Sequence, residues 1–198
     1  MNPDDTKRIL NFYNDSFAKY GNDPRSVHWS GEISQNVRFE VLTNIAALAG
    51  RSVLDVGCGL GDLYKFFVTK EISVDYAGID IVPGFIERAQ ERFPEAQFIL
   101  GDVSTIDGEY DYIFASGVLN LTVENGKEYY FRMIEKMFFH AKYGLAFNML
   151  NEDAHPTNET YIAYNVDEVR NYCETLSDKV EVISGYLPQD FTVYMYKE

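Results

Sequence analysis

Hydrophobic and polar positions divide the chain into a helical first quarter and an alternating remainder. Asn2 can cap a helix in which apolar residues recur at helical spacing until Gly21. A second apolar stripe runs from Ile33 to Leu48 and stops at Gly50, which predicts a second helix. The first 50 residues are therefore expected to form a helical unit ahead of the first strand.

From Ser52 onward, short β-branched or aromatic runs alternate with helical patterns, which is typical of repeated βα units and a parallel sheet. Strands are predicted near residues 52–56, 75–80, 96–100, 110–115 and 143–149. Helices are predicted between and after them, over residues 61–68, 83–93, 125–139 and 165–176. Two final alternating runs, 180–186 and 191–196, are joined by four residues, which is too short for a parallel crossover. The fold class is therefore a doubly wound, mostly parallel α/β sheet whose last strand is antiparallel.

Length and composition favour a globular protein. The 198 residues, 46% of them hydrophobic, fit one domain over 1–198, with 1–50 as a helical cap and 51–198 as the core. No apolar run has the length of a membrane span, and the N-terminus lacks the features of a signal peptide, so a cytoplasmic location is expected. Two cysteines, Cys58 in a glycine-rich turn and Cys173 in a predicted helix, are expected to be reduced thiols.

The charge of the chain argues against polyanionic partners. The formal net charge is -14, and Lys and Arg do not cluster with aromatic residues. Nucleic acids and anionic membranes are therefore not expected to bind. Acidity itself favours solubility, and a preference for a cationic substrate is the alternative explanation.

A glycine-rich turn carries the central chemical signal. An apolar strand leads into Gly57, Gly59 and Gly61 and then into a helix. Glycines at such a turn let the backbone bend tightly and approach a ligand. The NAD fingerprint is G-x-G-x-x-G, and Asp62 stands where its last glycine would be, which argues against a dinucleotide. A βα turn can also need glycine for backbone geometry alone.

Two acidic strand ends add to this signal. Asp80 ends the second predicted strand about 20 residues after the glycines, where a carboxylate can accept hydrogen bonds from ribose hydroxyls. Asp102 ends the third strand and can face the same crevice. Either acid alone could be a solvated strand end or a helix cap. Together with the glycines, they predict a nucleoside site.

The stretch from Ser52 to about Leu150 resembles the core of the class I S-adenosylmethionine-dependent methyltransferases, which have a Rossmann-like sheet. The resemblance implies S-adenosylmethionine as cofactor, with Asp55 near its methionine end, Asp80 on the ribose and Asp102 on the adenine amino group. The cofactor-binding residues implied in this way are Asp55, Gly57, Cys58, Gly59, Gly61, Asp80, Ile81, Asp102, Val103 and Ser116. The closing hairpin resembles the reversed last strand of the family, and the first 50 residues more distantly resemble the helical caps of its small-molecule members.

The expected activity is methyl transfer to an oxygen or nitrogen of an unidentified small molecule. Nucleic-acid amino-methyltransferases of this fold usually carry an Asn- or Asp-Pro-Pro-aromatic motif after the fourth strand, where this chain has Ala115-Ser116-Gly117-Val118. No Cys or His pair has zinc-ligand spacing, so no metal is assigned. Two other functions stay open, namely a catalytically inactive regulatory protein that binds S-adenosylmethionine or S-adenosylhomocysteine, and a nicotinamide oxidoreductase.

Catalytic residues are left unassigned. Side chains that could act as a base lie in segments able to cover the site, and each is also explained by packing or by surface exposure: Tyr13, Tyr20, His28, His155, Tyr161 and Tyr164. Gln35 and Arg38 share a helix face near Trp29 and Ser34, and they could bind the cofactor carboxylate or the substrate, or form an ordinary exposed face. Residues 1–35 and 148–165 are expected to act as covers that choose the substrate, with tyrosines as their walls.

Overall fold

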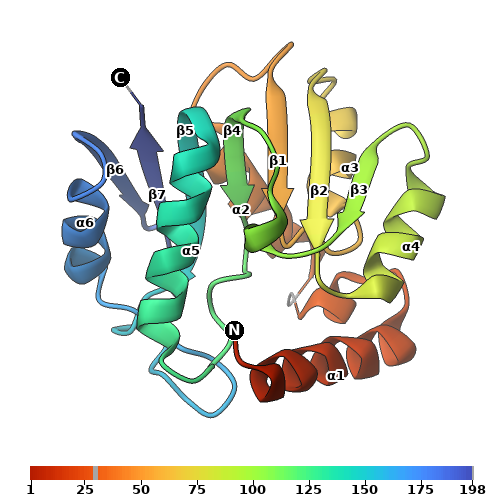
Figure 1. Cartoon of the computed structure of the whole chain (residues 1–198), viewed down its shortest axis with the longest axis horizontal. Coiled ribbons are helices and arrows are strands. Elements are labelled where there is room, and N and C mark those ends of the chain that lie inside the picture. Colours follow the sequence, from red (N-terminus) through yellow and green to blue (C-terminus); the bar gives the residue numbers. More distant parts are fainter. Residues whose placement is uncertain (29–30, 198) are drawn as a thin grey trace.

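In the residues that the structure describes, 1–28 and 31–197, the alternating pattern forms one sheet of seven strands with helices on both faces (Figure 1). The structure is a computed structural model. The strands are β1 (Ser52–Val56), β2 (Asp75–Asp80), β3 (Gln97–Leu100), β4 (Tyr110–Ala115), β5 (Ala141–Leu150), β6 (Lys179–Ser184) and β7 (Asp190–Tyr196). The helices are α1 (Pro3–Tyr20), α2 (Glu32–Thr43), α3 (Asp62–Thr69), α4 (Pro83–Arg92), α5 (Gly126–His140) and α6 (Val166–Glu174), with short 3-10 helices η1 (Pro24–Val27) and η2 (Val103–Thr105).

The sheet order is β3-β2-β1-β4-β5-β7-β6. Neighbours from β3 to β5 are parallel, whereas β7 runs antiparallel to both β5 and β6. The Rossmann-like fold with a reversed last strand is thereby confirmed. The chain leaves β1 toward β2 on one side and later returns to β4 on the other, so β1 and β4 flank the switch point at which such sheets bind ligands.

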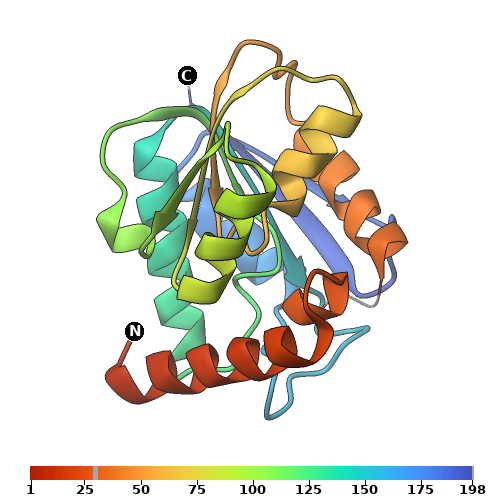
Figure 2. The same ribbon diagram turned by 90° about the vertical axis from the view of Figure 1, so that its right-hand side faces the viewer.

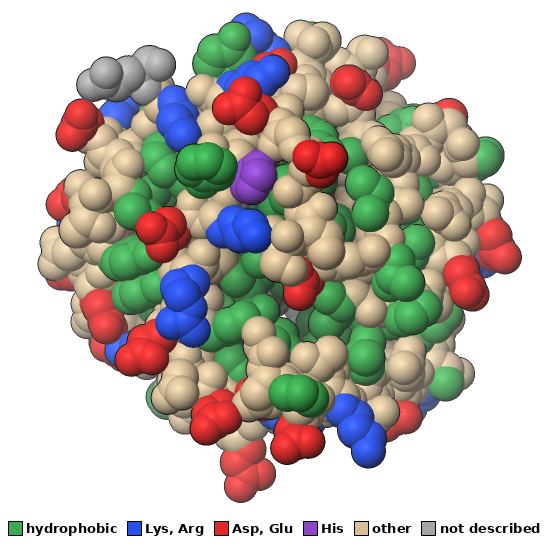
Figure 3. Space-filling model, in the orientation of Figure 1, with side chains coloured by type: hydrophobic (Ala, Val, Ile, Leu, Met, Phe, Trp, Pro, Cys, Tyr) green, Lys and Arg blue, Asp and Glu red, His purple; other side chains and the backbone are tan. Residues whose placement is uncertain are grey.

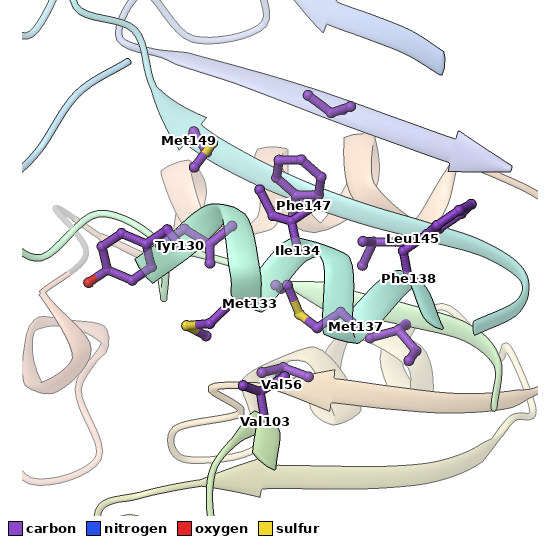
Figure 4. Close-up of a cluster of buried hydrophobic side chains, with 14 of the residues drawn as sticks. Val56, Val103, Tyr130, Met133, Ile134, Met137, Phe138, Leu145, Phe147 and Met149 are labelled. Atoms are coloured by element: carbon purple, nitrogen blue, oxygen red, sulfur yellow. The ribbon is translucent and has the colours of Figure 1, made fainter. Parts of the chain in front are cut away.

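Alternation along each strand divides the core into two layers. Val53 and Phe114 face one side of the sheet and pack with α2, α3 and α4. Leu54 and Ile113 face the other side and pack with α5 and α6. Figure 2 shows α5 on one side of the sheet and α2 and α3 on the other, and Figure 4 shows apolar side chains of α5 directed at β5 and β1. Both faces are covered, which explains the nearly continuous apolar runs of the parallel strands.

Helix α1 lies outside both layers and crosses the carboxyl ends of the strands (Figures 1 and 2). As predicted, Asn2 caps it, accepting a hydrogen bond from the Asp5 backbone N–H at 2.7 Å. The first turns of α1 also contact the loop after β4. The Asp5 side chain accepts a hydrogen bond from the Glu124 N–H at 2.9 Å, and Arg8 donates one to the Thr122 carbonyl. Helix α1 is therefore held over the edge of the sheet where β1 and β4 part.

One expectation about the helices needs correction. The second helix ends at Thr43 and not near Leu48, although Ile45 and Leu48 are buried, so the last part of the apolar stripe reflects packing of a turn and not a helix. The 3-10 helices were not predicted. Trp29 lies outside the described residues. None of the helices in the described part of the chain has the length and apolar character needed to cross a membrane.

Candidate active site

A cavity of about 290 Å³ opens at the carboxyl edge of the sheet, between the ends of β1 and β4. Loops after four successive parallel strands form its floor, and α1, η1, α2 and the segment after β5 also line it. Nine of the ten residues predicted to bind the cofactor line this cavity: Asp55, Gly57, Cys58, Gly59, Asp80, Ile81, Asp102, Val103 and Ser116. The tenth is Gly61, which serves a different purpose.

The three glycines are needed for three different contacts. Gly57 has φ +75, and a Cβ there would lie 2.7 Å from the Cβ of Val118. Gly59 has φ +53, and its Cβ would stand 3.0 Å from Val27. Both positions thus leave room for the backbone only, beside the cavity. Gly61 faces away from the cavity, and a Cβ there would lie 2.9 Å from the ring of Phe98, so this glycine permits close packing of α3 on the sheet.

Asp80 connects the glycine loop to the end of β2. One carboxylate oxygen accepts from the Gly59 N–H and the other from the Val82 N–H, both at 2.9 Å. Burial raises the pKa of this carboxyl, and the backbone hydrogen bonds oppose that rise. Each carboxylate oxygen can accept more than one hydrogen bond, so Asp80 can hold the loop and still meet a ligand.

Asp55 lies buried on the floor of the cavity. The Tyr76 hydroxyl donates a hydrogen bond to its carboxylate at 2.8 Å. The pKa of Asp55 is raised to about 7, because burial and the neighbouring carboxylates of Asp80 and Asp62 raise it while the Tyr76 hydrogen bond lowers it. This side chain therefore changes charge near neutral pH.

The loops after β3 and β4 complete the floor. Asp102 caps η2 by accepting from the Ser104 N–H at 2.6 Å, and it is exposed, whereas Val103 beside it is buried. The Asn148 side chain donates to Ser116 at 3.1 Å and accepts from the Gly117 N–H at 2.9 Å. Asn148, a buried residue of β5, thus fixes the loop after β4.

Asp62 contributes to the site in a way that the sequence did not reveal. At the start of α3 it accepts from Arg92 at 2.8 Å and from Gln35 at 3.2 Å, and it lines the cavity. The only sequence signal was its departure from the NAD glycine spacing. The tertiary fold makes Asp62 the junction of α2, α3 and α4.

Gln35 and Arg38 both line the cavity and are each 4% exposed, so the interpretation of an exposed helix face is wrong. Arg38 pairs with Asp190 at the start of β7, and both side chains are almost fully buried. Arg38 also donates to the Ser34 carbonyl at 2.9 Å. Asp190 was not among the residues selected from the sequence, because no local motif connects it to Arg38.

The covering segments bring some of the expected side chains to the cavity. Its lining includes these four candidates: Tyr13, His28, His155 and Tyr161. Tyr20 is not among the described lining residues and instead lies against the Arg25 guanidinium, 4.8 Å from its ring centre. Tyr164 is fully buried in the core and donates to the Leu119 carbonyl at 2.8 Å. The prediction that Tyr20 and Tyr164 form cavity walls is therefore wrong.

Comparison with known proteins agrees with this geometry. A family model described as a methyltransferase domain matches residues 53–138. A Mycobacterium tuberculosis protein named as a methyltransferase is 36% identical over 77 residues, which cover 37% of this chain and 45% of that protein. The trans-aconitate 2-methyltransferase of Methylobacterium nodulans is 30% identical over 82 residues, covering 40% of this chain and 32% of that enzyme. The matches thus span less than half the length of these curated relatives.

A solved structure extends the likeness to the whole fold. The magnesium protoporphyrin IX methyltransferase of Synechocystis PCC 6803, with bound S-adenosylmethionine, superposes with a TM-score of 0.73 over 100% of both chains. Sequence identity in this comparison is 16%, so the likeness concerns the fold.

Proposed function

Because this chain belongs to the class I S-adenosylmethionine-dependent methyltransferases, we propose that it transfers a methyl group from S-adenosylmethionine to a small molecule. One observation carries the proposal: the glycine loop and the acidic residues at the end of β2 and after β3, Asp80 and Asp102, line the same cavity. A regulatory protein that binds the cofactor without turnover is the alternative, and the two differ in whether labelled methyl leaves the cofactor.

The residues around the cavity suit this cofactor. A Cβ at Gly57 or Gly59 would run into Val118 or Val27, so only glycine lets the loop backbone lie here, where it can pass beneath the ligand. In this proposal the Asp80 carboxylate accepts hydrogen bonds from the ribose hydroxyls. Asp102 binds the adenine amino group, and Val103 packs on the adenine ring. Asp55 lies toward the methionine end, where its negative form favours the positive charges of the ligand.

Methyl transfer places few chemical demands on the protein. When bound, the cofactor supplies an electrophilic methyl group, so alignment of an acceptor with it provides much of the rate. The work of this chain is then to orient the acceptor and exclude water. Tyr13 from α1 and Tyr161 from the segment after β5 form part of the enclosure, and residues 1–50 and 51–198 act as one unit in this arrangement.

A small acceptor agrees with the size and charge of the site. The cavity is about 290 Å³ and is covered by α1, which leaves little room for a polymer. In Figure 3, Lys and Arg side chains are interspersed with Asp and Glu over the face shown, with no large basic cluster. With the net charge of -14, this supports a small molecule over a nucleic acid.

Replacement of Asp80 tests the cofactor assignment. Asp80→Ala removes charge-assisted hydrogen bonds to ribose, so the dissociation constant for S-adenosylhomocysteine is expected to rise about 10- to 100-fold. Isothermal calorimetry measures this change. Asp75→Ala, at the exposed opposite end of β2, is the matched control and should bind normally.

Asp80→Asn serves as a second variant because it keeps an acceptor for the Gly59 N–H. A folded Asp80→Ala protein with unchanged affinity would remove Asp80 from the ribose site. Thermal stabilisation by NAD and not by S-adenosylhomocysteine would overturn the proposed function itself.

A further inference from the structure

Resting on the proposed function, we infer that the methyl acceptor is a small molecule with a hydroxyl or amine group, and that His155 accepts its proton in a subsite formed with Asp190 and Tyr161. The inference deepens the proposed function by naming a substrate class and a proton acceptor. It stands on where the strand pairing places His155 and on the charges that line the cavity.

The pairing of β5 with β7 brings His155 to Asp190. Leu150, the last residue of β5, is in register with Asp190, the first residue of β7. The turn that follows is tied back at both ends, since the Asn151 N–H donates to the Gln189 carbonyl and the His155 N–H donates to the Asn151 carbonyl, each at 2.9 Å. The turn therefore packs against the start of β7. A positive charge on His155 is close enough to Asp190 to lower the pKa of that carboxyl.

The imidazole of His155 has an unused nitrogen. Its Nδ1 is buried and has no hydrogen-bond partner among the described residues, and the residue lines the cavity. The ring meets Tyr161 edge-on, with centroids 5.8 Å apart at 83°. A buried polar atom without a partner costs free energy, and a hydroxyl or amine of a bound acceptor would satisfy it.

The other two histidines are occupied. Nε2 of His28 lies 2.6 Å from the Ser16 hydroxyl, and its ring stacks on Phe12 at 3.9 Å. Nδ1 of His140 lies 2.7 Å from the Gly108 carbonyl, and His140 is not among the described lining residues. His155 is thus the histidine placed to receive a proton from a ligand in this cavity.

Other titratable groups near His155 suit different roles. Burial raises the pKa of both Tyr13 and Tyr161, which keeps these phenols protonated and able to donate hydrogen bonds. Burial raises the pKa of Asp190, which approaches His155 from β7, and the Arg38 guanidinium of α2 opposes that rise. The carboxylate form of Asp190 stabilises an imidazolium on His155.

The charges of the cavity disfavour an anionic acceptor. Among the described lining residues, five carry carboxylates, whereas Arg38 is the one side chain with a fixed positive charge. Arg38 is already engaged by Asp190 and by the Ser34 carbonyl. The relative from Methylobacterium nodulans is named for trans-aconitate, a carboxylate, and such an acceptor has no proton to remove. The acceptor inferred for this chain is of a different class.

The proton balance of the reaction explains the need for His155. The acceptor oxygen or nitrogen forms a bond to the methyl carbon, the carbon–sulfur bond breaks with its electron pair remaining on sulfur, and the acceptor proton passes to the His155 imidazole. Asp190 stabilises the resulting positive charge. Exchange with solvent then returns His155 to its neutral form.

The test uses the full chain and a matched panel, in which each small alcohol, phenol and amine has a carboxylic acid of the same carbon skeleton. Transfer of labelled methyl from S-adenosylmethionine is measured for wild type, His155→Gln and the control His140→Gln. We expect transfer to hydroxyl or amine compounds only. His155→Gln should lower kcat about 100-fold or more, while His140→Gln behaves as wild type.

A binding measurement gives a second readout. In the 15N-histidine NMR spectrum of the complex with S-adenosylhomocysteine, the methylated alcohol or amine should shift the His155 ring signals and leave those of His140 in place. Calorimetry should show unchanged binding of S-adenosylhomocysteine to His155→Gln.

Preferential methylation of the acids would overturn the inference, as would an unaltered kcat in His155→Gln. Each of these results leaves the cofactor assignment intact. Failure of wild type to bind S-adenosylhomocysteine, or binding with no methyl transfer to any compound, would instead refute the proposed function.

Discussion

At the scale of single residues, the site depends on carboxylates whose surroundings differ. Asp80 is held by two backbone N–H groups, Asp62 by an arginine, and Asp55 by one phenol in the buried floor. Solvation and partners, rather than residue type, therefore set the pKa of each carboxyl. In the case of Asp55, burial raises the pKa to about 7.

The raised pKa of Asp55 predicts how stability depends on pH. The folded state binds the Asp55 proton more tightly than the unfolded chain, so this residue lowers stability as pH rises from its ordinary pKa of 3.8 to about 7. Asp55→Asn should remove this loss. Between about pH 5 and pH 8, the variant is expected to gain about 2–3 kcal/mol in unfolding free energy relative to wild type.

Urea unfolding at the two pH values measures the difference, with Asp75→Asn as an exposed control. Parallel pH dependence in wild type and Asp55→Asn would show that Asp55 has an ordinary pKa in the folded protein.

At the scale of elements, the Arg38–Asp190 pair joins α2 to the first residue of β7 across 152 residues of sequence. The side chains are 5% and 2% exposed, so each charge depends on the other for compensation. Contacts of the same chemistry on the surface, such as Lys65 with Glu32, are half-exposed and screened by water. Of the two pairs, the buried one therefore contributes more to holding α2 on the sheet.

Removing one partner of this pair should lower the free energy of unfolding more than replacing both partners with apolar residues. Arg38→Met leaves a buried unpaired carboxylate and is expected to destabilise the fold by about 3–5 kcal/mol. Arg38→Met with Asp190→Leu should recover most of that loss, whereas Lys65→Met should cost at most about 1 kcal/mol. Urea titration of wild type, Arg38→Met, Asp190→Leu, the double variant and Lys65→Met tests this. Simple addition of the two single effects in the double variant would contradict the coupling.

At the scale of the whole molecule, two segments that are far apart in the sequence, α1 and residues 151–165, cover one cavity. Helix α1 is fastened to the loop after β4 through Asn2, Asp5 and Arg8. The segment 151–165 is fastened to the same region, since the Thr122 N–H donates to the Thr160 carbonyl and the Ile162 N–H to the Asn120 carbonyl. Both covers thus share one anchor, the stretch between β4 and α5.

This shared anchor predicts coupled closure of the two covers. A ligand must pass one of them to reach the cavity, so their amides should exchange with solvent quickly in the free protein and slow when S-adenosylhomocysteine binds. Hydrogen exchange followed by mass spectrometry should show added protection in residues 1–28 and 151–165, with β5 unchanged. Equal exchange in both states would mean that these segments form a fixed wall.

The sequence alone was enough to determine the order of elements, most of their limits and the glycine-rich loop after β1. These features depend on neighbouring residues: β1, β2 and β4 follow from apolar runs, the cap at Asn2 from its own turn, and the glycine loop from its spacing. The positions of Asp80 and Asp102 followed as well, since the ends of parallel strands meet at one edge of a sheet.

Tertiary structure alone decided which polar groups share the cavity. Arg38 and Asp190 meet only because β7 inserts beside β5, and His155 reaches Asp190 through the same pairing. Tyr13 faces the cavity while Tyr164 enters the core, although both looked alike in sequence. The physical reason is that burial and long-range charge pairing arise from packing of distant segments, which local periodicity does not encode.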